Sequence, residues 1–194
     1  MGIKIMILGL VLFLGVHLFT IMRPHRAALL ARLGEHGYKG LYSLISILGL
    51  ALIVYGFARY RQGEWIDVWL PPVWTRHLAA LLVLFALIMF VASYSRGRIY
   101  TTLKHPMLAG VKLWALAHLM ANGDLGSIIL FGSILAWAVI DRISLKRRSD
   151  PGAPPIPVGG TRNDVIAIFG GVAAYAVLGF WFHPYVIGIP VFGA

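Results

Sequence analysis

The chain has 194 residues, of which 59% are hydrophobic and only 12% are charged, and its apolar residues form long runs. A helix needs about 20 mostly apolar residues to cross a bilayer, so the composition predicts an all-α polytopic membrane protein without a sizeable soluble domain. The excess of 17 basic over 7 acidic residues lies mainly in short loops, which fits membrane topology better than nucleic-acid binding. Cysteine is absent, which excludes disulfides, iron–sulfur clusters and thiolate ligands.

Apolar runs bounded by charge, glycine and proline predict about six membrane helices. Their expected bounds are near residues 4–22, 39–58, 76–94, 106–121, 124–141 and 164–182. The first run is interpreted as an uncleaved span because it is long and lacks a small-residue cleavage site. Most basic residues fall in alternate loops, so the positive-inside rule places both termini on the outer, periplasmic side.

The whole chain, residues 1–194, is expected to form a single transmembrane domain with a mobile cytoplasmic loop at 143–163. Proline and glycine in that loop prevent a continuous helix. Thr161 and Asp164 are predicted to form a capping box that opens the last span. The segment 64–74 carries three tryptophans beside acids and a double proline, which is typical of an aromatic anchor at the outer interface or of a lid over a lipid-facing pocket.

Two of the seven histidines, His17 and His118, lie inside apolar runs without charged neighbours in the adjacent turns. A neutral imidazole in hydrocarbon must satisfy a ring N–H and a ring nitrogen, which a structural hydrogen bond or a metal can do. Two such histidines on different helices also meet the requirement of a bis-imidazole haem b. The sequence is compatible with structural hydrogen bonding and with metal or haem ligation. Four other histidines are predicted to be interfacial polar residues, namely His25, His36, His77 and His183.

The remaining histidine, His105, lies on a different face of the helix 106–121 from His118, because thirteen residues at about 100° each separate them by roughly 220°. His118 shares its face with Trp114 and Asn122. One face is therefore suited to a cofactor and the other to an anion or a lipid headgroup.

Lys104 and His105 begin the predicted helix at the inner interface, where a basic pair meets anionic lipid or substrate. Lys112 follows His105 on one face and lies deeper, so it is expected to pair with an acid or a substrate. The candidate acids are Asp141 and Asp124, the latter in an Asn-Gly-Asp turn with Asn122.

The block from His105 to Asp124, with His-Pro, a glycine, a tryptophan, Ala-His and Asn-Gly-Asp, resembles the signature of the NnrU family of bacterial membrane proteins. The cis-zeta-carotene isomerases of plants and cyanobacteria belong to the same family. The similarity extends from Val11 to about Arg142.

This resemblance implies a haem b protein of the bacterial inner membrane, with His17 and His118 as axial ligands and metal-binding residues, and Trp114 beside the cofactor. It also implies an isomerase-like activity on a hydrophobic polyene, or a diatomic gas ligand, since the family was named for an association with denitrification and nitric oxide metabolism. The isomerases carry a cysteine as an alternative ligand where this chain has Ala115, so exchange to a thiolate is excluded.

Other functions are also compatible with the sequence. The segment from Lys104 to Gly110 is similar to the Arg-His-Pro-x-Tyr-x-Gly segment of isoprenylcysteine and phospholipid methyltransferases, which bind S-adenosylmethionine at the cytosolic membrane face. The arginine, the tyrosine and the downstream acidic pair of those enzymes are missing here. A non-enzymatic haem, redox or nitric oxide sensor, an electron-transfer subunit and a purely structural helical protein are further alternatives, and no catalytic residue is assigned.

Overall fold

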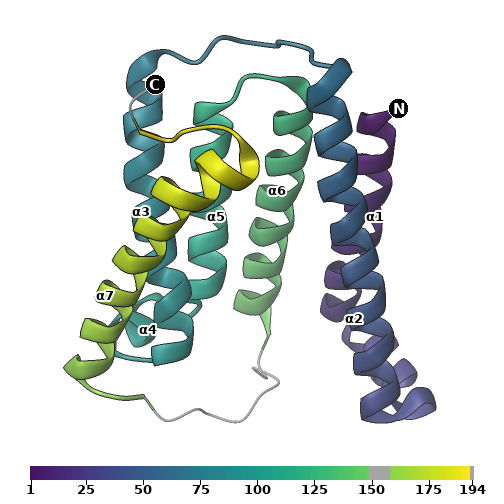
Figure 1. Cartoon of the computed structure of the whole chain (residues 1–194). Coiled ribbons are helices and arrows are strands. Elements are labelled where there is room, and N and C mark those ends of the chain that lie inside the picture. The colour runs from purple at the N-terminus through teal and green to yellow at the C-terminus, as the bar shows by residue number, and fades with distance from the viewer. Residues whose placement is uncertain (149–157, 193–194) are drawn as a thin grey trace. The chain divides into compact units, whose positions relative to one another are not determined.

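The computed structural model describes residues 1–148 and 158–192, and the residues described are almost entirely helical (Figure 1). The helices divide into two compact units. The first unit, residues 1–70 and 122–148, holds α1 (Gly2–Ile21), α2 (Arg23–Gly63) and α6 (Leu125–Arg147). The second unit, which begins at Pro71 and resumes after residue 148, holds α3 (Val73–Ser95), α4 (Arg98–Leu103), α5 (Pro106–Ala121), α7 (Thr161–Val177) and η1 (Leu178–Ile187).

Five of the helical segments are long and apolar enough to cross a membrane. They are α1, α2, α3, α6 and the continuous segment Thr161–Ile187. The sixth predicted span, α5, begins and ends where the sequence predicts but has only 16 residues, or about 24 Å against a hydrocarbon core of roughly 30 Å. The all-helical membrane fold is therefore confirmed, whereas the number of spans and the outer location of both termini stay predictions.

The first basic segment, residues 23–39, is helical and does not form the loop that the sequence analysis predicted. α2 already begins at Arg23, with Pro24 in its first turn, and Gly34 interrupts it at φ 69° and ψ 172°. After this break the helix continues, with Lys39 donating to the carboxylate of Glu35 one turn earlier (2.6 Å). The residues between the start of α2 at Arg23 and the interruption at Gly34 favour a helix as strongly as the apolar run that follows. Hydropathy alone missed this part of α2.

The α1–α2 contact depends on glycines that let the two antiparallel backbones approach closely. Gly9 of α1 lies against Gly49 of α2, and Gly2, seven residues earlier on α1, lies against Gly56, seven residues later on α2. A Cβ on Gly49 would stand 2.7 Å from the backbone nitrogen of Phe13. Small residues at such positions are a common means of packing helices in lipid, where burial of apolar side chains gives no advantage.

The start of α6 is fixed by Asp124, whose carboxylate accepts a hydrogen bond from the Ser127 N–H (2.9 Å). The preceding residue, Gly123, accepts backbone hydrogen bonds from Val68 and Trp69, so the segment after α2 pairs locally with the turn before α6. Tyr60 is fully buried beside this junction. Asp124, also fully buried, therefore serves as the N-cap of α6, a role that the sequence analysis did not predict.

We expect Asp124→Ala to lower the free energy of unfolding of the first unit by about 1–2 kcal/mol, because it removes the cap of α6. Thermal unfolding of the detergent-solubilised protein, followed by circular dichroism, measures the change. Asp67→Ala is the matched control, since Asp67 lies opposite Asp124 but its exposed carboxylate accepts, among the described residues, only from the Trp65 indole. Equal stability of the two variants would contradict this assignment.

The second unit is built around α3, which packs against both α5 and α7. Gly110 of α5 lies against Phe90 and the backbone of Ala86. Gly171 of α7 lies in the same way against Ile88. Glycines thus bring two helices close to α3, as they do between α1 and α2.

The beginning of α7 is joined to the α3–α4 corner by polar contacts. Asp164 accepts a hydrogen bond from the Ile99 N–H near the start of α4 (2.9 Å), and Asn163 donates to the carbonyl of Ser95. The N-cap of α7 is Gly160, without a side-chain cap. The predicted capping box of Thr161 and Asp164 is therefore wrong, because Asp164 caps α4 instead. Of the predicted mobile loop 143–163, residues 149–157 lie outside the described residues, and 143–147 extend α6.

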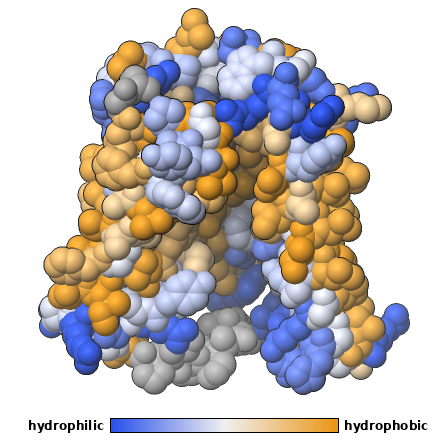
Figure 2. Space-filling view, viewed as in Figure 1, coloured by the Kyte–Doolittle hydropathy of each residue, from blue (hydrophilic) through white to orange (hydrophobic). Residues whose placement is uncertain are grey.

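The exposed sides of the helices are mostly apolar, and hydrophilic residues gather toward the helix ends (Figure 2). Large apolar side chains such as Leu44, Ile47 and Phe169 are about two-thirds exposed or more. A contiguous apolar surface of this extent is incompatible with water and is what lipid contact requires. Trp65, Trp69 and Trp74 are also exposed, and their predicted location in an interface stays a prediction.

Candidate functional site: two histidines held in one tautomer

His17 lies near the end of α1 among aromatic rings from three helices of the first unit. Its ring centroid is 4.3 Å from that of Phe13, 5.3 Å from that of Tyr42 on α2 and 5.4 Å from that of Trp137 on α6. The imidazole is half-buried. These rings exclude water from one side of His17 and hold its orientation.

One ring nitrogen of His17 is satisfied within its own helix. Nδ1 lies 2.6 Å from the carbonyl oxygen of Phe13, one turn earlier. Since a carbonyl oxygen only accepts, Nδ1 carries the proton and the Nε2 of the neutral ring keeps a lone pair. This tautomer is the one that metal-ligating histidines adopt when a backbone carbonyl supports them.

The aromatic cluster around His17 also contains polar atoms that lack a partner. The indole Nε1 of Trp137 and the hydroxyl of Tyr38, which stacks on Tyr42 at 6.5 Å, are buried without a hydrogen bond to any described residue. Arg26 lies 5.6 Å above the ring of Tyr38. Buried polar atoms are normally satisfied, so the cluster suits a polar or partly polar ligand.

His118 on α5 repeats this arrangement in the second unit. Its Nδ1 lies 2.8 Å from the carbonyl oxygen of Trp114, one turn earlier, so Nε2 is again the nitrogen with a lone pair. The Trp114 ring is tilted over the imidazole with centroids 4.8 Å apart. Both side chains are half-buried. The predicted neighbourhood of Trp114 and His118 is therefore present in the structure.

The structure does not bring His17 and His118 into one described cluster, because they belong to different units. Their ligation of the same haem iron thus stays a prediction. What they share is local chemistry: a half-buried imidazole, a backbone carbonyl on Nδ1 and an aromatic ring one turn earlier.

The predicted anion contacts of the second unit lie near the start of α5. Lys104 is exposed at φ 62°, a conformation rare for residues other than glycine. His105 precedes the helix, and its carbonyl accepts from the Ala109 N–H (3.1 Å). Lys112 is half-buried, and no acidic side chain within 1–148 or 158–192 forms an ion pair with it. Pairing of Lys112 with an acid is thus not observed, and contact with a substrate stays a prediction.

The other two predicted contacts, Asn122 and Asp124, belong to the first unit. Asn122 is half-buried at its boundary, whereas Asp124 is fully buried. One oxygen of Asp124 caps α6, and the other has no hydrogen-bond partner among the described residues. The structure therefore assigns Asp124 a structural role, and its contact with an external ligand stays a prediction.

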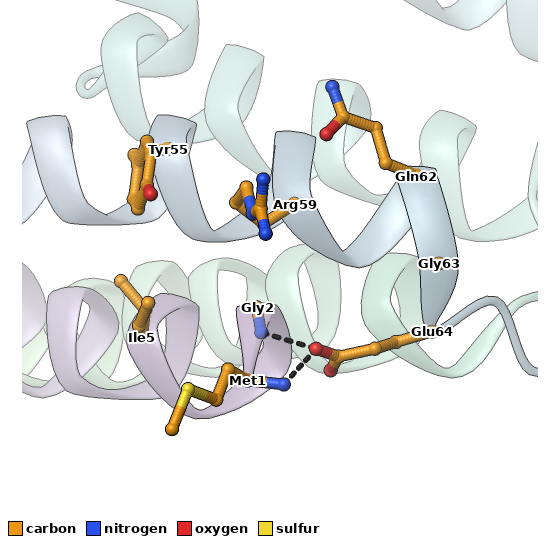
Figure 3. Close-up of a pocket in the computed structure, with 8 residues that line it drawn as sticks. All are labelled: Met1, Gly2, Ile5, Tyr55, Arg59, Gln62, Gly63 and Glu64. Carbon is orange, nitrogen blue, oxygen red and sulfur yellow. Dashed lines mark hydrogen bonds and ion pairs between the residues drawn. The ribbon is translucent and has the colours of Figure 1, made fainter.

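A polar pocket of about 420 Å³ lies at the opposite end of α1 from His17 (Figure 3). Glu64 at the end of α2 accepts hydrogen bonds from the N-terminal amine of Met1 and from the Gly2 N–H (2.6 Å). Arg59 and Tyr55 line the α2 side. The fifteen residues from Gly2 to His17 correspond to about 22 Å of helix, so this pocket is distinct from the cluster around His17.

Sequence analysis missed two groups of residues near the candidate ligands. Tyr38 and Tyr42 are four residues apart on α2, a spacing that places both on one helix face and was readable from the sequence. His183 was interpreted as an interfacial residue, but it lies within the helical segment η1 with its ring centroid 6.4 Å from that of His118. No local pattern predicts this approach, because the two histidines are 65 positions apart.

Within residues 1–148 and 158–192, no group of three or more His, Asp or Glu side chains could by itself hold a metal ion. A pair of imidazoles instead suits a metal whose other positions are filled by a macrocycle. The apolar helices and the supported histidines together define an integral, multi-pass membrane protein with candidate imidazole ligands.

The family model described as NnrU protein matches residues 5–191, and the chain therefore belongs to the NnrU family. The resemblance found in the sequence block His105–Asp124 is thereby confirmed. Comparisons with curated proteins and with solved structures found no match.

Proposed function

We propose that this protein is an integral membrane haem b protein in which His17 and His118 are axial ligands. The observation that carries the proposal is the shared state of the two imidazoles, each with Nδ1 held by the carbonyl one turn earlier and Nε2 left with a lone pair. Iron binds the ring nitrogen that carries no proton. The backbone hydrogen bond to Nδ1 therefore fixes both the tautomer and the ring orientation that ligation through Nε2 needs.

The surroundings of both histidines support the same proposal. Phe13, Tyr42 and Trp137 form an aromatic wall at His17, and Trp114 does so at His118. Such rings shield an iron–imidazole bond from water and pack against a flat, apolar macrocycle. The unpartnered Trp137 indole N–H is a donor available to the polar groups of a bound cofactor. Haem, if bound by these residues, would supply an iron that can change oxidation state and bind a small ligand.

The proposal extends to the substrate of the protein and to the membrane in which it lies. We propose an activity similar to that of the cis-zeta-carotene isomerases, or a role in nitric oxide metabolism, in the bacterial inner membrane, on the basis of the sequence resemblance within the NnrU family. A polyene would reach the site from the lipid, consistent with the apolar helix surfaces. Contacts of Lys104 and His105 with an anionic substrate or a lipid headgroup are part of this proposal, and the exposed position of Lys104 supports the first of them.

An optical spectrum of the purified protein tests the proposal. We expect a Soret band in the oxidised protein after haem supplementation, and sharpened visible bands of a six-coordinate b-type haem after reduction. A colourless preparation that does not take up added haem would show that the proposed function is wrong.

A turnover assay distinguishes a haem-dependent isomerase from a haem protein without enzymatic activity. Incubation of the reduced protein with a cis-polyene, followed by chromatography of the isomers, reports isomerase activity. A reversible redox midpoint without polyene turnover would favour a sensor or an electron-transfer subunit.

A further inference from the structure

The pocket between the start of α1 and the end of α2 contains an arginine whose charge is not balanced within the first unit. Arg59 lines this pocket of about 420 Å³ together with Tyr55 and Gln62, and all three belong to α2. Tyr55 and Arg59 are four residues apart, which places them on one helix face, and Figure 3 shows both side chains on the pocket side of α2. No carboxylate within residues 1–148 and 158–192 forms an ion pair with Arg59.

The acid of this pocket, Glu64, is already bound to the start of α1. Its Oε1 accepts from the amine of Met1 and from the Gly2 N–H (2.6 Å), and its Oε2 accepts from the Ile3 N–H (3.3 Å). The first N–H groups of a helix have no partner within the helix, and Glu64 supplies one. Both carboxylate oxygens thus have partners on α1, so the guanidinium of Arg59, with five N–H donors, is the group that the pocket offers to an anion.

The length of α1 places the pocket at the edge of the hydrocarbon core. α1 is a candidate membrane span of 20 residues, which correspond to about 30 Å of helix, or roughly the thickness of the core. A span of this length puts its first residue, Gly2, level with the lipid headgroups. The exposed Trp65 directly follows Glu64, and tryptophan is enriched at this depth. The pocket therefore lies where lipid phosphates are found.

An apolar surface leads away from the pocket along the same two helices. On α1, the half-exposed Leu8 lies one turn after the pocket residue Ile5. On α2, the half-exposed Leu48 lies seven residues before Tyr55 and therefore on the same helix face. Because α1 and α2 are antiparallel, both leucines lie on the membrane side of the pocket. This surface can contact acyl chains whose headgroup occupies the pocket.

We propose that this pocket binds the phosphodiester headgroup of an anionic phospholipid, with the acyl chains against the apolar surface of α1 and α2. The planar guanidinium of Arg59 donates to two phosphate oxygens at once, and Tyr55 and Gln62 supply further donors to the headgroup. A lipid bound only by the folded protein stabilises the first unit. The site shares no residue with the cluster around His17, so the inference is independent of the proposed haem function.

Thermal unfolding of the detergent-solubilised protein, with phosphatidylglycerol titrated into the micelles, tests the inference. Arg59→Gln is compared with Lys4→Gln, since Lys4 is an exposed basic residue of α1 that does not line the pocket. Both substitutions remove one positive charge. We expect Arg59→Gln to weaken lipid binding by about 10–100-fold, because it removes charge-assisted hydrogen bonds to the phosphate. Lys4→Gln should weaken binding by less than about fivefold, the usual size of an exposed charge effect.

Two further ligands identify the source of the phosphate. Phosphatidylcholine, which has no net charge, should stabilise the protein less than phosphatidylglycerol does, and inorganic phosphate at the same concentration should have no effect because it lacks acyl chains. Equal stabilisation by the two lipids, stabilisation by inorganic phosphate, or equal losses in Arg59→Gln and Lys4→Gln would each overturn the inference.

A second variant covers the case in which Arg59→Gln does not fold. Tyr55→Phe removes only a hydroxyl from the pocket and keeps the ring on α2. We expect it to weaken binding of phosphatidylglycerol by about 2–10-fold, the effect of one neutral hydrogen bond. Unchanged binding in Tyr55→Phe would then overturn the inference.

Discussion

His118→Ala is expected to abolish stable haem binding. Loss of a group that merely orients a metal ligand lowers metal affinity by about 10–100-fold, and loss of the ligand itself must cost at least as much. His118 is one of the two proposed iron ligands, so its loss would leave a bound haem with a single protein ligand. Haem content per protein, measured as the pyridine haemochrome, should therefore fall at least about tenfold in this variant.

Trp114→Phe provides the matched comparison for His118→Ala. The hydrogen bond to Nδ1 comes from the backbone carbonyl of residue 114, which the substitution leaves in place. Phenylalanine keeps an aromatic ring against the imidazole, as tryptophan does at 4.8 Å. We expect near-normal haem content in Trp114→Phe. Equal haem loss in both variants would indicate that packing of α5, and not ligation by His118, holds the cofactor.

Gly49→Leu is expected to destabilise the first unit by about 3 kcal/mol, the upper part of the range for overpacked cores. A side chain at residue 49 would meet the Phe13 nitrogen at 2.7 Å and the Gly9 carbonyl oxygen at 3.0 Å, and neither backbone atom can move without separating α1 from α2. Since His17 is on α1 and Tyr42 on α2, the aromatic cluster should open as well. Thermal unfolding in detergent measures the first effect, and the change in tryptophan fluorescence that is lost in a Trp137→Phe background measures the second.

Gly40→Leu is the control for Gly49→Leu because both glycines lie on α2. A Cβ on Gly40 would meet no atom within 4 Å, so leucine should gain helix propensity of up to about 1 kcal/mol. The two substitutions are thus expected to change stability in opposite directions. A loss of stability of similar size in both variants would show that α1 and α2 do not depend on glycine contact.

The surroundings of His17 and His118 differ, and this difference would affect chemistry at an iron bound by them. His17 is surrounded by aromatic rings from three helices, whereas His118 and His183 face one another between α5 and η1. A six-coordinate iron with two imidazoles has no position for a gas or a polyene. A bound gas or polyene would therefore require one of the two proposed ligands to be released, and residue 115 is alanine in this chain, so a thiolate cannot replace it.

Local properties of the sequence were sufficient to predict the helical membrane fold and to single out His17 and His118 as imidazoles that need a hydrogen-bond partner or a metal. Hydropathy marks α1, α3, α5 and α6 because each apolar run is continuous in the chain. The hydrogen bonds on His17 and His118 run to residues four positions earlier, and so they depend only on helix geometry. Hydropathy failed at residues 23–39 because a charged, amphipathic stretch forms a helix without an apolar run.

The sequence by itself therefore determined the membrane class and the family, both of which rest on contiguous segments, whereas iron ligation by His17 and His118 stays a prediction. Only the tertiary structure placed His183 beside His118, assigned Asp164 to the cap of α4 and brought Gly9 against Gly49. Each of these contacts joins residues at least 40 positions apart. Such pairings depend on how helices pack, and packing is decided by the fit of whole helix faces, which no local periodicity encodes.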